Sequence, residues 1–311
     1  MTVVPTELTN RYRGAMVGVA IGDALGARFE GHPGPVDPGT VAAHLGDTSP
    51  LTYTDDTALT IAVAESLLAC GRLDDDHLAH ELAATYSREP HRGYGAGTAA
   101  LLGQVAAGGD WRRLAAAQFD GTGSFGNGAA MRSTPLALHA GSRPVLAADL
   151  ARRAARTTHT HPAGAEGAAA ISAAISHTLC GARPGTLPHI VQLIVREPHL
   201  ADQLWAVADL PAHADPQVVA GTTGTGISAL EAVPAAIASH TQNPDSFTDT
   251  IAFAISLGGD TDSIAAMAGA LAGACHGYGA IPHAWIDRVE GCERLLQLAD
   301  RLAARHTDRG V

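Results

Sequence analysis

Apolar residues recur at intervals of three and four positions along most of this chain, and that spacing is typical of helices that bury one face. The pattern predicts helices at 11–27, 58–69, 77–86, 98–107, 129–139, 143–157, 164–179, 188–195, 227–239, 247–256, 263–276 and 286–304. Runs that alternate between apolar and polar residues, which would indicate β-strands, are scarce. The predicted fold class is therefore all-α.

Glycine-rich segments separate the predicted helices and are predicted to be loops. They read "EGHPGPVDPGT", "HRGYGAGT", "DGTGSFGNGAAMR" and "AGTTGTGIS". The stretches 181–188 and 209–216 are also predicted loops, but helices of the same composition continue on both sides of each. Because no segment has the composition of a linker, we expect a single domain over residues 1–311, with a core at about 11–305.

Composition and charge argue against nucleic-acid-binding and membrane-spanning proteins. Hydrophobic residues make up 46% of the 311 residues and aromatic residues only 4%, so small aliphatic side chains must fill the core. The net charge of −11 argues against general nucleic-acid binding, which needs a basic surface. The four cysteines are far apart with no CxxC pair, and no apolar run is long and uninterrupted enough to span a membrane. We expect a cytoplasmic protein that binds neither membranes nor nucleic acids.

Two helix starts carry more acid than a helix start needs. "YTDDTALT" places Thr54, Asp55 and Asp56 before a strongly apolar helix, and "GGDTDSIAA" does the same with Asp260 and Asp262. One carboxylate or hydroxyl is enough to cap a helix, and burying further charges is costly unless something pairs with them. Oxygen donors of this kind suit Mg²⁺, Mn²⁺ or Ca²⁺ rather than zinc. Ordinary capping and a divalent-cation site are the two interpretations.

Two of the loops lead directly into helices. "GSFGNGAAMR" and "GYGAGTAALL" would expose backbone N–H groups at a helix start, and such groups bind phosphate and other anions. No GK[ST] follows either loop, so neither is a nucleotide-binding P-loop. The alternative is that the glycines only allow close packing of helices.

Together these segments identify a family. The chain resembles the ADP-ribosylglycohydrolases, also called the dinitrogenase-reductase-activating-glycohydrolase superfamily. The matching segments are "GAMVGVAIGDALGARFEG", "YTDDTALTIAVAESL", "HRGYGAGT", "FDGTGSFGNGAAMR", "TTHTHPAGAEGAAAI", "GTGISALEAVPAAI" and "ISLGGDTDSIAAMAGALAGA". "FEGH", "GYGAG" and "GISALEAVPAAI" look closest to the branch that cleaves O-linked ADP-ribose, including ADP-ribosyl-serine.

The resemblance implies a fold, a reaction and site residues. It implies a compact, single-domain orthogonal helical bundle that holds two magnesium ions, or manganese, in a central cleft. The implied metal ligands are Thr54, Asp55, Asp56, Asp260, Asp262 and Ser263. The implied residues of the ADP-ribose pocket are Gly95, Gly97, Phe119, Ser124, Phe125, Gly126, Asn127, His159 and Ile227. The alternative for His159, Phe119 and Phe125 is that they are ordinary core residues.

Glu30 corresponds in this resemblance to a mobile glutamate that covers the metals and acts as the catalytic acid or base. Asp56 and Asp262 are the rival carboxylates, and the sequence does not choose among the three. The implied partners are ADP-ribose and an ADP-ribosylated protein or peptide, bound by a monomer. Hydrolysis of ADP-ribosyl-arginine, hydrolysis of a small-molecule or nucleic-acid conjugate, and ADP-ribose binding without catalysis remain the alternatives.

Overall fold

The computed structural model describes residues 6–308, in which helices are the regular elements and β-pairing is confined to three isolated bridges. The predicted all-α class is confirmed. The α-helices are α1 (Glu7–Gly26), α2 (Pro38–Leu45), α3 (Asp55–Cys70), α4 (Asp75–Arg88), α5 (Ala96–Ala106), α6 (Trp111–Ala117), α7 (Thr134–Ala140), α8 (Pro144–Ala155), α9 (Pro162–Leu179), α10 (Leu187–Val191), α11 (Pro198–Ala208), α12 (Pro216–Thr223), α13 (Ala229–Gln242), α14 (Phe247–Ser256), α15 (Thr261–His276), α16 (His283–Ile286) and α17 (Cys292–Asp308).

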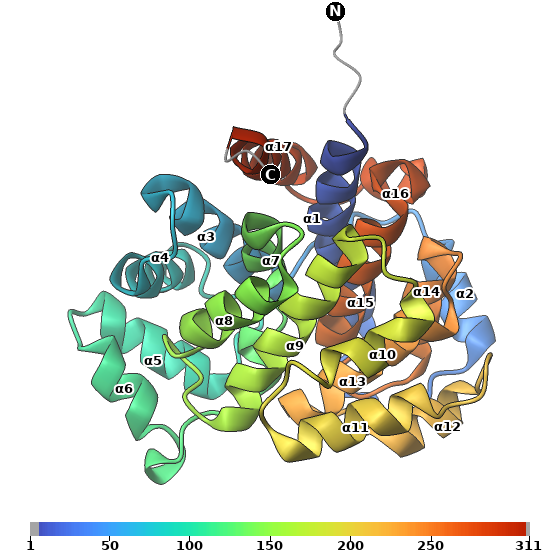
Figure 1. The fold of residues 1–311 in the computed structure, drawn as a ribbon, viewed down its shortest axis with the longest axis horizontal. Coiled ribbons are helices and arrows are strands. Elements are labelled where there is room, and N and C mark those ends of the chain that lie inside the picture. The colour runs from blue at the N-terminus through green and yellow to red at the C-terminus, as the bar shows by residue number, and fades with distance from the viewer. Residues whose placement is uncertain (1–5, 309–311) are drawn as a thin grey trace, which may run out of the picture.

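Helices α1 and α15 form the centre of the molecule and run antiparallel (Figure 1). Their backbones touch, because a methyl group placed at Gly14 would meet the carbonyl of Gly273, and one at Gly18 would meet that of Gly269. Only glycine permits so close an approach. The small residues of these two helices therefore allow this close packing.

The antiparallel pair also sets the position of the site. Gly26, the last residue of α1, lies against the backbone of Thr261 and Asp262 at the start of α15. The segment that follows α1 consequently emerges beside the carboxylates of α15. In Figure 1, α3–α6 lie to the left of the central pair, α12 and α14 lie to the right, and α11 lies below it.

Two predicted helices are interrupted. The helix expected at 129–139 is a 3₁₀ turn (Asn127–Ala129), an irregular segment and then α7, in which Pro135 occupies the first turn. Proline has no N–H to donate and is therefore favoured at a helix start. The helix expected at 286–304 is broken between α16 and α17, where Gly291 has a φ of +69°.

Four helices were not predicted: α2, α6, α11 and α12. Each begins after an acidic residue whose carboxylate accepts a backbone N–H of the first turn, namely Asp37, Asp110, Glu197 and Asp215, and α2, α6 and α12 have eight residues or fewer. Segments of this length show too few turns for an apolar period to stand out. Within residues 6–308, no helix combines the length and apolar character needed to cross a bilayer.

Candidate active site

The start of α3 is held by a carboxylate from another helix. Asp23 of α1 is fully buried and accepts hydrogen bonds from the backbone N–H of Thr54 and of Thr57, both at 3.0 Å or less, and from the Thr57 hydroxyl at 2.6 Å. The Thr54 hydroxyl accepts the N–H of Asp56. Asp23, Thr54 and the carbonyl of Arg92, which accepts the N–H of Asp55 at 2.8 Å, together satisfy the orphan donors of this helix start. The carboxylates of Asp55 and Asp56 are thus not needed as caps.

The start of α15 is arranged differently. Gly258 and Gly259 have φ values of +75° and +74°, a conformation that glycine adopts without strain. Asp260 precedes the first turn and accepts the side-chain amide of Asn127 at 2.5 Å. Asp262 accepts the N–H of Ser263 at 2.9 Å. Both carboxylates are buried, and each keeps oxygen lone pairs for a ligand.

Glu30 reaches this cluster from the segment after α1. The segment is tied down by two hydrogen bonds, from Gly31 N–H to Gly259 C=O at 2.8 Å and from Gly259 N–H to His32 C=O at 2.9 Å. Further along, Val36 N–H donates to Ser256 C=O. The mobility expected of this segment stays a prediction, since the structure shows the position in which Glu30 meets the α15 carboxylates.

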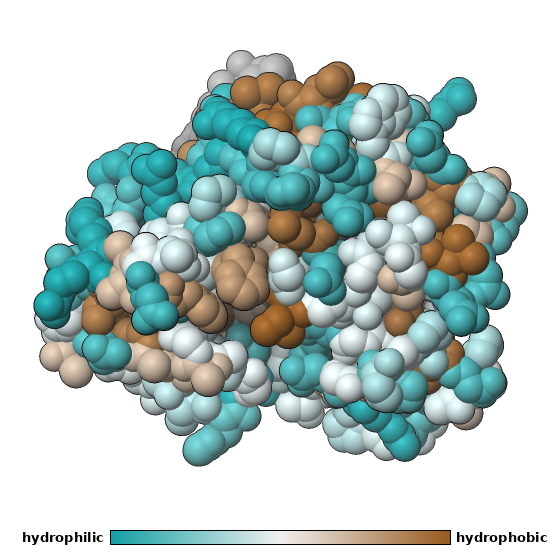
Figure 2. All heavy atoms as spheres, turned by 90° about the horizontal axis from the view of Figure 1, so that it is seen from below, coloured by the Kyte–Doolittle hydropathy of each residue, from teal (hydrophilic) through white to brown (hydrophobic). Residues whose placement is uncertain are grey.

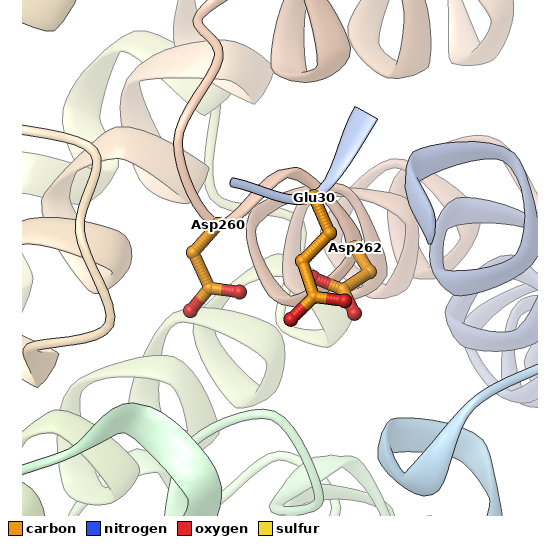
Figure 3. Close-up of side chains that lie close together, drawn as sticks. All are labelled: Glu30, Asp260 and Asp262. Atoms are coloured by element: carbon orange, nitrogen blue, oxygen red, sulfur yellow. The ribbon is translucent and has the colours of Figure 1, made fainter. Parts of the chain in front are cut away.

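Carboxylate oxygens of Glu30, Asp260 and Asp262 lie within 4.8 Å of one another (Figure 3). Asp56 joins them through the Ser263 hydroxyl, which lies 3.4 Å from its Oδ1. Asp56 Oδ2 is buried and has no hydrogen-bond partner within residues 6–308. The site therefore concentrates acidic oxygens from three distant parts of the sequence.

Burial and mutual repulsion raise the pKa values of these acids. Burial, then the charges of Asp23 and Asp262, raise the pKa of Asp55 to about 8. Burial and then Asp260 raise the pKa of Asp262 to about 7, and burial raises that of Glu30 above its ordinary value, with Asp262 adding to the effect. Repulsion of this kind disappears when a cation binds among the oxygens.

The donor set fits a hard divalent cation. It consists of carboxylates and a hydroxyl, with no thiolate or imidazole, and oxygen-only sets suit Mg²⁺, Mn²⁺ or Ca²⁺. The buried Asp56 Oδ2, which has no hydrogen-bond partner within residues 6–308, is consistent with a carboxylate that binds a cation. Residues 6–308 therefore contain an acidic cluster that can hold a metal.

One cavity of about 600 Å³ contains this cluster and almost all the other predicted site residues. From the predicted set it is lined by Glu30, Asp55, Asp56, Asp260, Asp262, Ser263, Gly95, Gly97, Phe119, Ser124, Phe125, Gly126, Asn127, His159 and Ile227. Thr54 is the predicted residue that does not line it. Residues that were assigned to one site from the sequence therefore line one cavity in the structure.

The glycine-rich loop before α7 forms part of the cavity wall and reaches the acidic cluster through Asn127, whose side-chain amide donates to Asp260. The N–H of Asn127 donates to Ile227 C=O at 2.9 Å, and the N–H of Gly126 faces the Ser124 hydroxyl at 3.4 Å. The backbone N–H groups of this loop were expected to bind phosphate, but that of Asn127 is already used within the protein. Ser124 and Phe125 supply the remaining backbone donors of this loop.

Aromatic and aliphatic side chains form the mouth of the cavity. Phe119 is 52% exposed, Phe125 is 39% exposed and Ile227 is 70% exposed. The two phenyl rings lie 5.2 Å apart between centroids. Because core residues would be buried, the alternative that these phenylalanines are ordinary core is wrong. Figure 2 shows hydrophobic atoms near the middle of one face, surrounded by more polar ones.

The sequence analysis missed Asp23 behind the site and, on the cavity wall itself, Arg132 and Gln118. Asp23, which organises α3, lay inside an apparently uniform apolar helix. Arg132 is buried in the cavity wall, where desolvation lowers its pKa to about 10 and leaves it charged at neutral pH. Gln118 also lines the cavity and donates to Thr158 C=O. The signal for Asp23 was a lone carboxylate in a helix with no other charge nearby.

Comparison with known proteins gives the same assignment. The family model described as ADP-ribosylglycohydrolase matches residues 4–310. This chain belongs to the ADP-ribosylglycohydrolase family. The family expected from the sequence motifs is thereby confirmed, and so is its class, the glycosidic-bond hydrolases.

Relatives of this glycohydrolase match over nearly its whole length. It is 37% identical to the zebrafish (Danio rerio) protein named ADP-ribosylhydrolase ARH3, over 96% of this chain and 92% of the relative. It is 33% identical to the human (Homo sapiens) protein of that name, over 94% and 93%. It is 28% identical to ADP-ribosylarginine hydrolase Tri1 of Serratia proteamaculans, over 96% and 80%.

A solved structure shares the fold. It is titled "ADP-ribosylglycohydrolase-related protein complex" and superposes with a TM-score of 0.76 at 30% sequence identity, covering 96% of this chain and 99% of the other. The arrangement of helices around the central α1–α15 pair is therefore shared with this solved structure.

Proposed function

We propose that this glycohydrolase cleaves the glycosidic bond between ADP-ribose and an O-linked acceptor, ADP-ribosyl-serine above all, and that it requires Mg²⁺. The observation that carries the proposal is the acidic cluster of Glu30, Asp260 and Asp262 at one end of a cavity whose other end is apolar and open. The higher identity to the ARH3 proteins than to the arginine-specific relative supports the O-linked acceptor.

The metal would be held by Asp55, Asp56, Asp260, Asp262 and Ser263, with Thr54 as a further donor at the start of α3. Two ions, magnesium or manganese, suit four aspartates that arrive from two helix starts. When bound, such ions would polarise the ribose and make a water more acidic. The chain's own contribution is to hold these oxygens rigidly, because both helix starts are fixed by Asp23 and by Asn127.

Glu30 is the proposed acid. It is the most exposed carboxylate of the cluster, and the partial loss of solvation at the cavity wall, with the charge of Asp262, raises its pKa and so favours a protonated carboxyl group. A protonated carboxyl can donate to the leaving oxygen of the acceptor, and its conjugate base can then accept a proton from water. Asp56 and Asp262 are the alternatives for the base.

The ligand would run from the carboxylates to the apolar mouth. The distal ribose would lie at the acidic end and the diphosphate beside Ser124, Phe125 and His159, while Phe119 would pack against the base. Gly95 and Gly97 provide room on the wall formed by α5. An ADP-ribosylated protein or peptide would approach from the open side. The monomeric state and a cytoplasmic location stay predictions.

The test is release of ADP-ribose from serine-linked and arginine-linked ADP-ribosyl peptides, each with Mg²⁺ and with EDTA. We expect metal-dependent release from the serine conjugate only. Release from the arginine conjugate would replace the proposed acceptor, and metal-independent release would remove the metal from the proposal. If both conjugates resist hydrolysis while ADP-ribose binds, panels of small-molecule and nucleic-acid conjugates decide between another acceptor and a binding protein.

The Glu30 assignment has its own test. Glu30→Gln keeps the size and shape of the side chain but removes the titrating proton. We expect kcat to fall by about 10²–10⁴-fold, with Mg²⁺ binding measured by calorimetry unchanged to within a few fold. Wild-type turnover by this variant would transfer the role to Asp56 or Asp262.

A further inference from the structure

A chain of buried side chains lies behind His159 on the cavity wall. Arg132 donates to the Thr158 hydroxyl at 2.6 Å, and that hydroxyl lies 2.7 Å from His159 Nδ1. All three residues are buried. His159 alone of the three was expected in the pocket, and nothing in the sequence connected it to the other two.

The charge of Arg132 fixes the direction of the first of these hydrogen bonds and favours one direction for the second. A guanidinium can only donate, so the Thr158 oxygen must accept from it. The hydroxyl proton of Thr158 then needs an acceptor, and within residues 6–308 the one in reach is His159 Nδ1. Nδ1 therefore carries no proton. Burial, with the charge of Arg132, lowers the pKa of His159 to about 3, so the ring is neutral and its proton is on Nε2.

The protonated nitrogen faces the proposed diphosphate position. A methyl group built at Gly128 would lie 3.0 Å from Nε2, and one built at Gly126 would lie 3.6 Å from it. Nε2 thus lies against the glycine-rich loop, and His159 lines the cavity. Nε2 has no hydrogen-bond partner within residues 6–308, which leaves its proton available to a ligand.

We propose that Thr158 is a positioning residue that locks His159 in the Nε2–H form and thereby supplies a neutral hydrogen-bond donor for a phosphate oxygen of ADP-ribose. This inference rests on the proposed function, because it uses the same cavity and ligand. The buried arginine acts through Thr158, and its charge directs the imidazole proton toward the ligand. An imidazole with a free choice of tautomer would present an acceptor to the phosphate for part of the time.

The first measurement is the ¹⁵N spectrum of the imidazole ring of His159 in the ligand-free wild-type protein, assigned with His159→Gln. We expect a non-protonated Nδ1 and a protonated Nε2. A protonated Nδ1 would overturn the proposal. This readout needs neither ligand nor metal, so it decides where the proton is even if the proposed function fails.

The second measurement compares three variants by the same spectrum and by calorimetric titration with ADP-ribose. Thr158→Val removes the hydroxyl, and we expect a mixture of the two tautomers and about tenfold weaker binding, since one hydrogen bond is worth about that factor. Thr158→Ser restores the hydroxyl, and we expect the wild-type tautomer with binding within about twofold of wild type.

Thr157→Val is the matched control. Thr157 is the neighbouring buried threonine, and its hydroxyl donates to Ala154 C=O and lies 3.4 Å from Arg132. We expect an unchanged His159 spectrum and wild-type affinity for this variant. If Thr158→Val keeps a pure Nε2–H ring, or if Thr157→Val weakens binding as much, Thr158 has no positioning role. If wild-type protein does not bind ADP-ribose, the proposed function fails, and with it the role of this donor toward that ligand.

Discussion

Helices α3 and α4 both begin with two aspartates in the first turn, but within residues 6–308 only the aspartates of α4 form ion pairs. In α4, Asp75 lies 2.8 Å from Arg153, and Asp76 lies 2.7 Å from Arg112. In α3, Asp55 and Asp56 are buried, and no residue within 6–308 forms an ion pair with either of them. Similar local sequences thus produce solvated ion pairs in one helix and an unpaired acidic site in the other.

The pKa values record this difference. The hydrogen bond from Arg112, then that from Trp111, lowers the pKa of Asp76 to about 2, whereas burial raises the pKa of Asp55 to about 8. An acid that the protein itself neutralises contributes to structure. An acid that the protein buries and leaves unpaired is available to a ligand. Whether a pair of aspartates at a helix start forms a binding site therefore depends on whether an arginine pairs with it, and not on the local sequence alone.

The strongest test of the comparison is Asp56→Asn. Asp56 Oδ2 is buried without a partner, so we expect removal of its charge to weaken metal binding and to lower kcat/KM by more than about 100-fold, because even residues behind metal ligands can cost 10–100-fold. Activity is measured on the serine-linked peptide over a range of Mg²⁺ concentrations. Activity within a few fold of wild type at saturating Mg²⁺ would show that Asp56 is a cap and not a ligand.

Asp23→Ala tests whether Asp23 caps α3 and so leaves Asp55 and Asp56 available to bind a metal. Asp23 accepts two backbone N–H groups of α3 and the Thr57 hydroxyl. Its loss leaves these donors buried and unpaired, so we expect the free energy of unfolding to fall by about 2–4 kcal/mol and Mg²⁺ affinity to fall with it. Chemical denaturation and calorimetry measure the two effects. Unchanged stability would mean that Asp55 or Asp56 takes over the capping, which contradicts the proposed division of labour.

The dependence of stability on pH is predicted to have opposite signs at the two helix starts. The folded-state pKa of Asp55 is raised from 3.8 to about 8, so its contribution is present below pH 3.8 and is lost as pH rises toward 8. The folded-state pKa of Asp76 is lowered to about 2, so its contribution is present above pH 3.8 and is lost as pH falls toward 2.

Urea denaturation in EDTA from pH 3 to pH 8 measures both effects. We expect Asp55→Asn to reduce the loss of stability between pH 4 and pH 8 by up to about 1.4 kcal/mol per pH unit, the limit for one proton. Asp76→Asn should change the profile only below about pH 4. A profile of Asp55→Asn parallel to wild type would show that the carboxyl group of Asp55 is not the one held protonated.

The smallest expected effect belongs to Asp75→Asn. This substitution breaks the ion pair with Arg153, which is partly exposed on both sides, and exposed pairs contribute less than about 1 kcal/mol. We expect a slightly lower free energy of unfolding and unchanged kcat/KM and Mg²⁺ affinity. It serves as the matched control for Asp56→Asn, because both remove one carboxylate from the first turn of a helix. A large loss of activity here would remove the distinction between the two helix starts.

Much of this site could be predicted from the sequence because its residues cluster in a few motifs. "TDDT" and "GGDTDS" carry an excess of acid that a helix cap does not need, and the glycine-rich loop marks another part of the cavity wall. Asp23 could not be found in this way, because a lone aspartate in an apolar helix gives no sign of which backbone groups it will cap. Arg132 and Thr158 were equally hidden, since their roles depend on a partner outside their own motif.

The sequence by itself determined the all-α class, the family and the positions of the acidic helix starts, because helical periodicity and local motifs are properties of neighbouring residues. Only the tertiary structure decided which aspartates stay unpaired. The glycine contacts between α1 and α15 bring Glu30 to Asp262, and Asp23 caps α3 in place of its own acids. These relations join residues far apart in the chain, and a carboxylate's charge state depends on the groups that folding places around it.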